Sequence, residues 1–424
     1  MNLQNYLREK WSMQPGNALG ECKIEAEAAT PAFFFDSDAF SARIHKIKEL
    51  LGKDIPLTYS IKANPFLLNC LPKEIEHVEV CSPGELEICQ KMGIAPEHII
   101  YSGVMKELTD VRRASLYGAF IMTAESMLHV QLENEVSTAV SPQKVILRLT
   151  SGNQFGMSED DIEYLVSHRE EYPNLEFYGI HYYSGTQKKK VKNIEKDLFH
   201  LTEFLSKLEE KYGFEAQLVE FGPGLAVNYF NEPYEDADMA LLAEAAEVLK
   251  GFAQSFPLGI EMGRFMAAPC GTYVTQVKDL KYSCDTNYMI VDGGMHHLKY
   301  YGQTMAMQVP PIWTLNGASH SAERESGVLA KDYCICGSLC TVADVLVREA
   351  RLPELQVGDF LGFERCGAYS VTEGSTLFLS RTMPKVYLYS NENGAKLLRD
   401  FVPTDRINMA EPLNACLAEV ASWN

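Results

Sequence analysis

The sequence lacks the long apolar stretch that a membrane-spanning protein needs. No window approaches the roughly eighteen uninterrupted apolar residues of a transmembrane helix. The segment from Met1 to Trp11 carries charges where a secretory signal would have its apolar stretch. These absences predict a cytoplasmic protein that is neither exported nor inserted in a membrane.

Regularly spaced cysteines are missing as well. Eleven cysteines, an odd number without a repeating interval, indicate reduced thiols rather than a disulfide framework. Cys334, Cys336 and Cys340 suggest a metal site by their closeness, but no second pair stands at zinc-ribbon spacing. His296 and His297 follow Asp-Gly-Gly, which indicates a turn, and adjacent residues do not share a helix face. The sequence therefore predicts no metal.

Basic residues are scarce relative to acidic ones. Lysine and arginine number 38 against 57 aspartates and glutamates, so the formal net charge is -19. Such a surface repels phosphate backbones and anionic lipids, which argues against nucleic-acid and membrane partners. The 46% hydrophobic and 22% charged residues are ordinary for a globular protein, and 424 residues suggest two or three domains.

Residues 36–270 alternate short β-rich runs with longer helical patterns. The predicted strands include Ile99–Ser102, Phe120–Thr123, Val145–Arg148, Phe177–Ile180 and Leu218–Phe221, with helices at Ala39–Leu51 and Leu198–Tyr212. This is the pattern of a (β/α)₈ barrel, whose site is built by loops at the carboxyl ends of the strands. From about residue 271 the pattern becomes mainly β, as at Val274–Leu280 and Tyr288–Asp292.

Lys62 stands where the apolar run Pro56–Ile61 ends, in the sequence Ser-Ile-Lys-Ala-Asn-Pro. An amine at the end of a barrel strand can be kept partly desolvated, and so easier to deprotonate, while an aldehyde cofactor still reaches it. A solvated surface lysine is the alternative, and this motif alone does not decide between them.

Further motifs follow in a fixed order. They are Val80–Glu85, Gly179–Gln187, Phe221–Gly224, Glu261–Arg264, Cys340–Asp344 and Gly367–Tyr369. Together with Lys62 they resemble, over about residues 30 to 380, the fold-type III pyridoxal phosphate decarboxylases of the diaminopimelate and ornithine group. The resemblance implies bound pyridoxal 5'-phosphate, an alanine-racemase-like (β/α)₈ barrel at 36–270, and a mainly β domain made of 1–35 and 271–424.

The resemblance also implies roles for single residues. Pyridoxal phosphate accepts the electron pair left after loss of carbon dioxide, so a carboxylate should face its ring nitrogen, and Glu261 is the candidate. Lys62 would form the Schiff base and Tyr183 would stack on the ring. The predicted phosphate ligands are Arg264, the hydroxyls of Thr186 and Tyr369, and the loops of Gly222, Gly224 and Gly263.

Cys340 would protonate the carbanion, and the family donates this segment from the other subunit, which implies a homodimer with shared active sites. A buried, inert cysteine is the alternative. Thr341 replaces a carboxylate that ornithine- and diaminopimelate-type enzymes aim at the distal ammonium, and the diaminopimelate arginine is absent from Asp292–Gly302. Thr341 and Asp344 are therefore the predicted substrate residues, and a free distal amine is poorly provided for.

Tyr183 stands where most of these decarboxylases have histidine, and the role of the preceding His181 stays open. Tyr183, Gln154–Met157 and Val291–His297 are similar to the butirosin-pathway decarboxylases of the family, which act on a glutamyl group tethered to a carrier protein. The substrate would thus be a small or carrier-bound aminoacyl group. The basic run Lys188–Lys192 is either a solvated helix start or a rim that meets an acidic carrier.

Three other readings remain. A diaminopimelate decarboxylase proper would share every motif except the distal contacts. An alanine-racemase-like enzyme would place an arginine against the ring nitrogen, which Glu261 contradicts. A non-catalytic regulator resembling antizyme inhibitor would lose catalytic residues, yet Lys62, Arg264 and Cys340 are retained. A decarboxylase is the leading interpretation.

Overall fold

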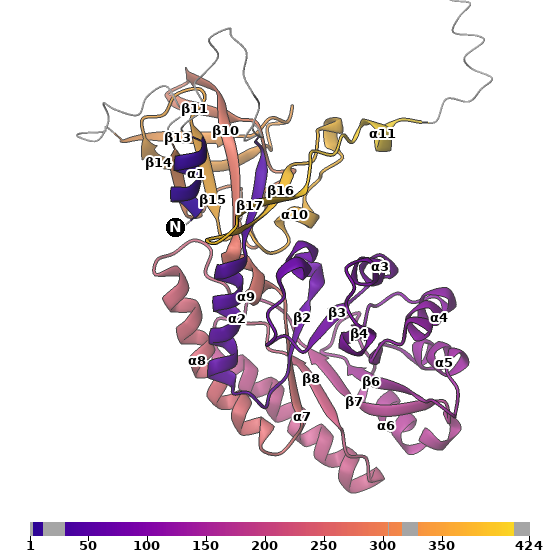
Figure 1. Ribbon diagram of the computed structural model, residues 1–424. Helices are drawn as coiled ribbons and strands as arrows, with labels where there is room; N and C mark the ends of the chain where they lie inside the picture. The colour runs from indigo at the N-terminus through magenta and orange to yellow at the C-terminus, as the bar shows by residue number, and fades with distance from the viewer. Residues whose placement is uncertain (1–2, 12–29, 304, 316–329, 411–424) are drawn as a thin grey trace, which may run out of the picture. The chain divides into compact units, whose positions relative to one another are not determined.

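The computed structural model describes residues 3–11, 30–303, 305–315 and 330–410. The chain divides into two compact units (Figure 1). One comprises Ser37–Cys270 with Gly367–Tyr369, and the other comprises Met1–Asp36, Gly271–Cys366 and Ser370–Asn424. No helix within these described ranges is long and apolar enough to cross a membrane.

The first unit is a closed barrel of parallel strands. In order around the barrel the strands are β2 (Leu57–Ser60), β3 (His77–Val80), β4 (Ile99–Tyr101), β5 (Ile121–Ala124), β6 (Gln143–Leu149), β7 (Leu175–Tyr183), β8 (Leu218–Gly222) and β9 (Leu258–Met262). Strands covered on both faces are mainly apolar, as the fully buried β4 and β5 are. The predicted (β/α)₈ barrel is confirmed.

Helices surround the strands of this unit (Figure 1). They are α2 (Ser37–Leu51), α3 (Pro83–Lys91), α4 (Leu108–Tyr117), α5 (Met127–Val136), α6 (Glu159–Ser167), α7 (Val191–Tyr212), α8 (Tyr234–Ala253) and the short α9 (Arg264–Ala267). In α7, Ile194, Leu198, Leu201 and Leu205 recur at three- and four-residue spacing and are buried, so one face of the helix packs inward.

The second unit is mainly β. In order across its sheet, the neighbouring strands are β14 (Val345–Pro353), β13 (Ala330–Cys336), β11 (Thr286–Val291), β10 (Gly271–Ser283), β1 (Ala32–Asp36), β16 (Lys385–Ser390) and β17 (Gly394–Arg399). Strand β15 (Phe360–Glu364) pairs with β10 and also with β12 (Ile312–Leu315). Short helices α1 (Leu3–Trp11), α10 (Ser370–Glu373) and α11 (Asp405–Asn408) accompany it.

The amino-terminal strand β1 lies inside that sheet, between β10 and β16. Phe34 on β1 shares an apolar core with Leu3 and Leu7 of α1, Val274 of β10 and Tyr389 of β16. Helix α1 and strand β1 are therefore part of the β unit, as the fold-class prediction stated. The physical reason is that β1 fills the gap in hydrogen bonding between two strands distant in sequence.

The segment Gly367–Tyr369 joins the barrel unit, although the chain on either side of it belongs to the β unit. Asn64 Nδ2 donates to the Gly367 carbonyl at 2.8 Å, and the Tyr369 amide donates to the Ala63 carbonyl at 2.7 Å. The sequence analysis assigned these residues to the second domain because they are continuous with it. Their hydrogen bonds instead attach Tyr369 to the turn that carries Lys62.

Candidate active site

A cavity of about 580 Å³, including its open mouth, lies where the barrel strands end. The barrel topology explains most of the polar lining of this cavity, because side chains at the carboxyl ends of the parallel strands converge at one end of the barrel. Its lining includes Ser60, Lys62, Glu79, Arg148, His181, Tyr183, Thr186, Gly224, Glu261, Gly263, Arg264 and Tyr369. The predicted Lys62, Glu261 and Arg264 therefore share one cavity.

Lys62 lies in a single 3₁₀ turn, Ile61–Ala63, directly after β2. Its Nζ donates to Glu79 Oε2 at 2.6 Å and lies 3.4 Å from the Cys81 sulfur and 3.7 Å from Glu261 Oε1. The Lys62 side chain is 39% exposed, whereas the Glu79 side chain is 5% exposed. The amine is thus reachable from the cavity while a buried carboxylate holds it.

The expectation that this amine is easily deprotonated is wrong. Burial works to lower the pKa of Lys62, but the negative charges around it, Glu79 first and Glu261 also, outweigh burial and raise the pKa well above its ordinary value. Lys62 is therefore held as an ammonium, and Glu79 is the nearest group able to receive its proton.

Glu261 near the end of β9 is held by two donors. Ser60 Oγ donates to Oε1 at 2.7 Å, and His181 Nε2 lies 3.0 Å from Oε2. Burial would raise the pKa of Glu261, but the Lys62 charge and the His181 contact prevail and keep it well below the usual range. A carboxylate that stays ionised in a buried position can hold a proton on a facing ring nitrogen.

Arg264, at the start of α9, forms a second polar group with aromatic hydroxyls. Its Nη1 lies 3.1 Å from the Tyr229 hydroxyl, and its guanidinium lies 4.4 Å from the centre of the Tyr369 ring. Tyr369 has a left-handed φ of 68°. The hydrogen bond from its backbone amide to the Ala63 carbonyl helps to hold this conformation. Thr186 lines the same cavity, so a cation and hydroxyls are available to one anionic group.

The loops after β7 and β8 approach each other so closely that only glycine fits between them. A Cβ on Gly224, whose φ is 61°, would stand 1.9 Å from the Gly185 carbonyl oxygen, and one on Gly222 would stand 2.6 Å from Cδ2 of Tyr183. The Lys188 amide donates to the Gly224 carbonyl at 2.8 Å. These contacts position Thr186 and set the Tyr183 ring against Gly222.

The basic run Lys188–Lys192 is divided between two environments. Lys188 is largely buried and forms an ion pair with Asp197 of α7, so it braces the loop and is no part of an exposed rim. Lys189, Lys190 and Lys192 are exposed at the start of α7. The prediction of a solvated run therefore fails for Lys188 only, because Asp197 compensates its charge.

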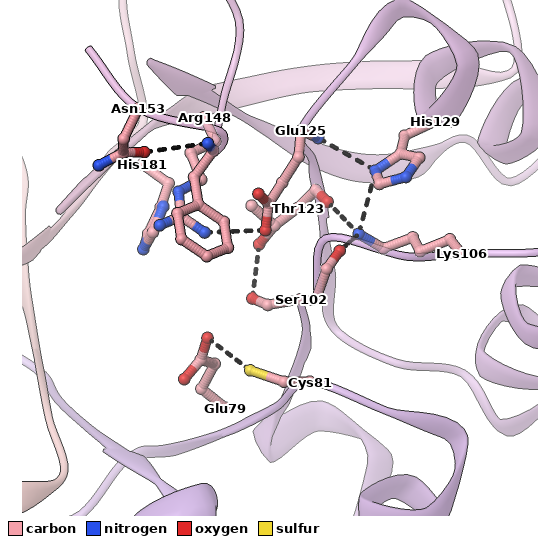
Figure 2. A network of polar contacts seen from close by, with 12 residues as sticks. Glu79, Cys81, Ser102, Lys106, Thr123, Glu125, His129, Arg148, Asn153 and His181 are labelled. Atoms are coloured by element: carbon pink, nitrogen blue, oxygen red, sulfur yellow. Dashed lines mark hydrogen bonds and ion pairs between the residues drawn. The ribbon is translucent and has the colours of Figure 1, made fainter. Parts of the chain in front are cut away.

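Two cavity residues were missed by the sequence analysis, Glu79 and Arg148. Arg148 of β6 pairs with buried Glu125 through Nη1 and Oε1 at 2.8 Å, and the Cys81 thiol lies 3.2 Å from Glu79 Oε1 (Figure 2). Both residues interrupt apolar strands, Val78-Glu-Val80 and Leu147-Arg-Leu149. A charged residue inside such a run is the signal that could have revealed them.

The comparisons with known proteins agree with this geometry. The family described as pyridoxal-dependent decarboxylase, pyridoxal binding domain, matches residues 37–268. An L-glutamyl-[BtrI acyl-carrier protein] decarboxylase of Niallia circulans is 28% identical over 85% of this chain and 89% of its own. A 2-[(L-alanin-3-ylcarbamoyl)methyl]-2-hydroxybutanedioate decarboxylase of Staphylococcus aureus is 26% identical over 84% and 93%. The family match spans more than half of the sequence.

The chain belongs to the pyridoxal-dependent decarboxylase family. It is an enzyme of the diaminopimelate and ornithine decarboxylase group, and its cofactor is pyridoxal phosphate. The fold agrees: diaminopimelate decarboxylase from Helicobacter pylori complexed with L-lysine has a TM-score of 0.76 at 21% identity, covering 90% of this chain and 96% of that one.

The residues of this decarboxylase fit the cofactor's chemistry. An amine, a buried ionised carboxylate, and a cation among hydroxyls are the partners that an aldehyde, a pyridinium nitrogen and a phosphate require. Lys62, Glu261 and Arg264 supply them within one cavity. Nothing in the donor set conflicts with the cofactor.

Cys340 belongs to the other unit of the decarboxylase, in the loop between β13 and β14. It is exposed, so a buried, inert cysteine is not what the fold contains. Asp344 is buried, and its two oxygens accept the amides of Met295 and Leu339 at 2.7 Å each. Asp344 therefore fixes the loop on which Cys340 and Thr341 stand.

The residues weighed as metal ligands have other surroundings in this enzyme. The sulfurs of Cys334 and Cys336 lie 3.8 Å apart, and the His296 and His297 rings are 3.7 Å apart between centres and buried. Within the described ranges, no group of three or more histidine, cysteine or acidic side chains is arranged to hold a metal ion.

Proposed function

We propose that this enzyme removes the α-carboxyl group of an amino acid whose distal end is acylated or tethered to a carrier protein. The observation that carries the proposal is the cavity in which Lys62 meets Glu79 and Glu261, with Arg264 on the same lining. Two of the relatives support the substrate class, since the name of one specifies a carrier-bound glutamyl group and that of the other an amide-linked alanine derivative.

Each residue has a defined task. Bound pyridoxal phosphate supplies an electron sink for the pair left on the α-carbon. Lys62 provides the amine that holds the cofactor, and Glu79, 2.6 Å from that amine, accepts the proton that the amine must lose. Glu261 retains its negative charge, and it would face the ring nitrogen of the bound cofactor.

The phosphate site uses the second polar group. Arg264 would bind the phosphate, Thr186 and Tyr369 would donate hydroxyl hydrogens, and the glycine-rich loops would let backbone amides approach. Tyr183 offers an aromatic face where most of the family has histidine. Its ring is seated against Gly222, and burial raises the pKa of Tyr183, so its hydroxyl stays protonated.

Cys340 of one subunit of a homodimer would give its thiol proton to the α-carbon that has lost carbon dioxide in the site of the other subunit. Its exposed loop supports this, because an inert thiol gains nothing from that position. Apolar side chains on and near the loop are exposed: Val342 on the loop is 99% exposed, and Met305, which lines the same hollow, is 70% exposed. Apolar groups exposed together are the usual mark of a protein interface, and a second copy of the chain would cover them.

The residues expected to face the distal end of the substrate do not provide a partner for an ammonium group. Thr341 offers a hydroxyl rather than a carboxylate, and the segment Asp292–Gly302 contains no arginine. Within that segment Lys299 is paired with Glu373 at 2.9 Å. Exposed Lys189, Lys190 and Lys192 would meet an acidic carrier.

Substrate comparison tests the proposal. A glutamyl thioester on a carrier protein and an amide-acylated diamino acid should be decarboxylated, whereas free lysine, ornithine and diaminopimelate should be poor substrates. Turnover of free diaminopimelate with kcat/KM above about 10⁴ M⁻¹s⁻¹ would instead make the chain a diaminopimelate decarboxylase proper. Racemisation without carbon dioxide release would favour the racemase alternative.

A further inference from the structure

Glu261 is bound on both carboxylate oxygens by side chains from other strands. Ser60, the last residue of β2, donates to Oε1 at 2.7 Å. His181 of β7 contacts Oε2 at 3.0 Å. Ser60 and His181 are both almost completely buried, so water does not compete strongly for either contact. We call Ser60 and His181 the carboxylate clamp.

The contact fixes where the histidine proton lies. An ionised carboxylate only accepts hydrogen bonds, so the hydrogen must sit on His181 Nε2. His181 Nδ1 is buried and has no hydrogen-bond partner among the residues that the structure describes. Among the described residues, the contact with Glu261 is therefore the hydrogen bond that orients the ring, and the Nε2 hydrogen is directed at that carboxylate.

The clamp matters because Lys62 has a second task. Lys62 Nζ lies 3.7 Å from Glu261 Oε1 and helps to keep that carboxyl ionised. The same amine would hold the cofactor, and its charge and place would then be set by that bond rather than by the ion pair with Glu261. Ser60 and His181 take no part in bonding the cofactor, so their hydrogen bonds persist.

A second buried carboxyl, Glu220, shows what happens when burial outweighs the donors. Glu220 on β8 is buried, and burial, with the charges of Glu261 and Glu79 adding to it, raises its pKa to about 8 although Thr58 opposes the rise. Glu261 carries the opposite shift under comparable burial. Two carboxyls whose environments push their pKa values apart take different roles: one stays neutral and the other stays charged.

We propose that Ser60 and His181 are positioning residues that hold Glu261 ionised and directed at the cofactor's ring nitrogen after Lys62 is engaged. The inference rests on the function proposed for Glu261. It goes beyond that function by assigning His181, and by naming the donors on which the electron sink depends.

The first experiment uses cofactor-free protein with Lys62 replaced. In Lys62→Ala protein, carboxyl ¹³C NMR should still find Glu261 ionised at pH 7, because the clamp remains. In Lys62→Ala/Ser60→Ala/His181→Met protein, the Glu261 titration should move upward by at least one pH unit. An equal titration curve in the two proteins would overturn the inference.

The second experiment uses the loaded enzyme with a ¹⁵N-labelled pyridine nitrogen. His181→Met and Ser60→Ala should shift that resonance toward the unprotonated form and lower kcat about tenfold or more, with little change in KM. His181→Gln, which returns an N–H donor, should restore both readouts in part. Ser102→Ala is the matched control, since Ser102 is a buried strand-end serine that pairs with Thr123 at 2.9 Å.

A parallel variant separates the two claims. Glu261→Gln should remove the ring proton and lower kcat by roughly 10². If Glu261→Gln leaves the ring protonated, the role proposed for Glu261 is wrong. If Glu261→Gln removes the proton while both clamp variants retain it with kcat within twofold of wild type, only the clamp is overturned.

Discussion

The Lys62 amine has to satisfy two opposing requirements. It must lose a proton to bond an aldehyde, yet Glu79 at 2.6 Å and Glu261 at 3.7 Å stabilise its charged form. The same pairing satisfies the buried carboxylates, which would otherwise be costly to leave unpaired. In the proposed function, Glu79 would hold the lysine charged before the cofactor is bound and would accept the proton that the amine must lose.

Replacing this lysine tests the residue-scale account. Lys62→Ala protein should lose the visible absorbance of the bound cofactor after dialysis, and borohydride should no longer fix the cofactor to the chain. The reason is that, among the described residues, no other lysine lines this cavity. Wild-type protein treated in parallel is the control. Persistent absorbance together with borohydride labelling of the variant would assign the bond to another lysine.

At the scale of elements, the site depends on how β7, β8 and β9 end. The loops after β7 and β8 are joined by the hydrogen bond from the Lys188 amide to the Gly224 carbonyl, and β9 ends just before Arg264. Beneath them, Glu220 occupies the barrel interior against Gly259, where an added Cβ would stand 2.6 Å from Glu220 Oε2. The loops line the cavity, and the strand interiors determine which carboxyls ionise.

The loop contact predicts that Gly224 cannot be replaced. In Gly224→Ala protein the new Cβ would clash with the Gly185 carbonyl at a left-handed φ of 61°, so the Kd for pyridoxal phosphate should rise tenfold or more and stability should fall by about 1–3 kcal/mol. Gly251→Ala is the matched control, because Gly251 lies in α8 with open space around its Cβ position. Similar Kd values for the two variants would contradict the prediction.

The pKa of Glu220 predicts a pH effect on the stability of the barrel. Its folded pKa of about 8 exceeds the ordinary 4.5, so the folded state binds a proton that the unfolded state has released. Stability therefore falls as pH rises from about 4.5 to about 8. In cofactor-free protein, Glu220→Gln should become more stable than wild type between pH 6 and 8.5 by on the order of 2 kcal/mol.

Urea unfolding at several pH values measures this difference. Glu195→Gln, at an exposed position of α7, is the matched control and should follow the wild-type pH profile. A Glu220→Gln profile parallel to wild type would mean that Glu220 ionises freely in the folded protein.

At the scale of the whole molecule, the predicted site residues fall in two compact units. Lys62, Glu261 and Arg264 belong to the barrel, whereas Cys340 and Thr341 belong to the β unit. If the active enzyme is a dimer with shared sites, each site takes its lysine from one subunit and its cysteine from the other.

Subunit mixing tests this arrangement. Lys62→Ala and Cys340→Ala proteins should each be nearly inactive, but equal amounts that exchange subunits form about half heterodimers, each with one intact site. About a quarter of wild-type activity should return. Mass spectrometry of tagged chains must establish that exchange occurred. With exchange established, activity no higher than the mean of the two parents would place both residues in one subunit's site.

Much of the fold and of the cavity could be predicted from the sequence. Hydrophobic periodicity is local, so alternating strands and helices, and the change of pattern near residue 271, were readable without coordinates. Residues at strand ends meet in a barrel by topology alone, which is why Lys62, Glu261 and Arg264 could be assigned to one site. The ordered motifs then specified the cofactor.

Tertiary structure alone decided how those residues are charged and held. Ser60 and Glu261 are 201 residues apart, and no sequence pattern indicates that they lie 2.7 Å from each other. The raised pKa of Lys62 and the burial of Lys188 beside Asp197 likewise depend on neighbours supplied by other elements. Burial and charge act through space, and only the folded chain sets those distances.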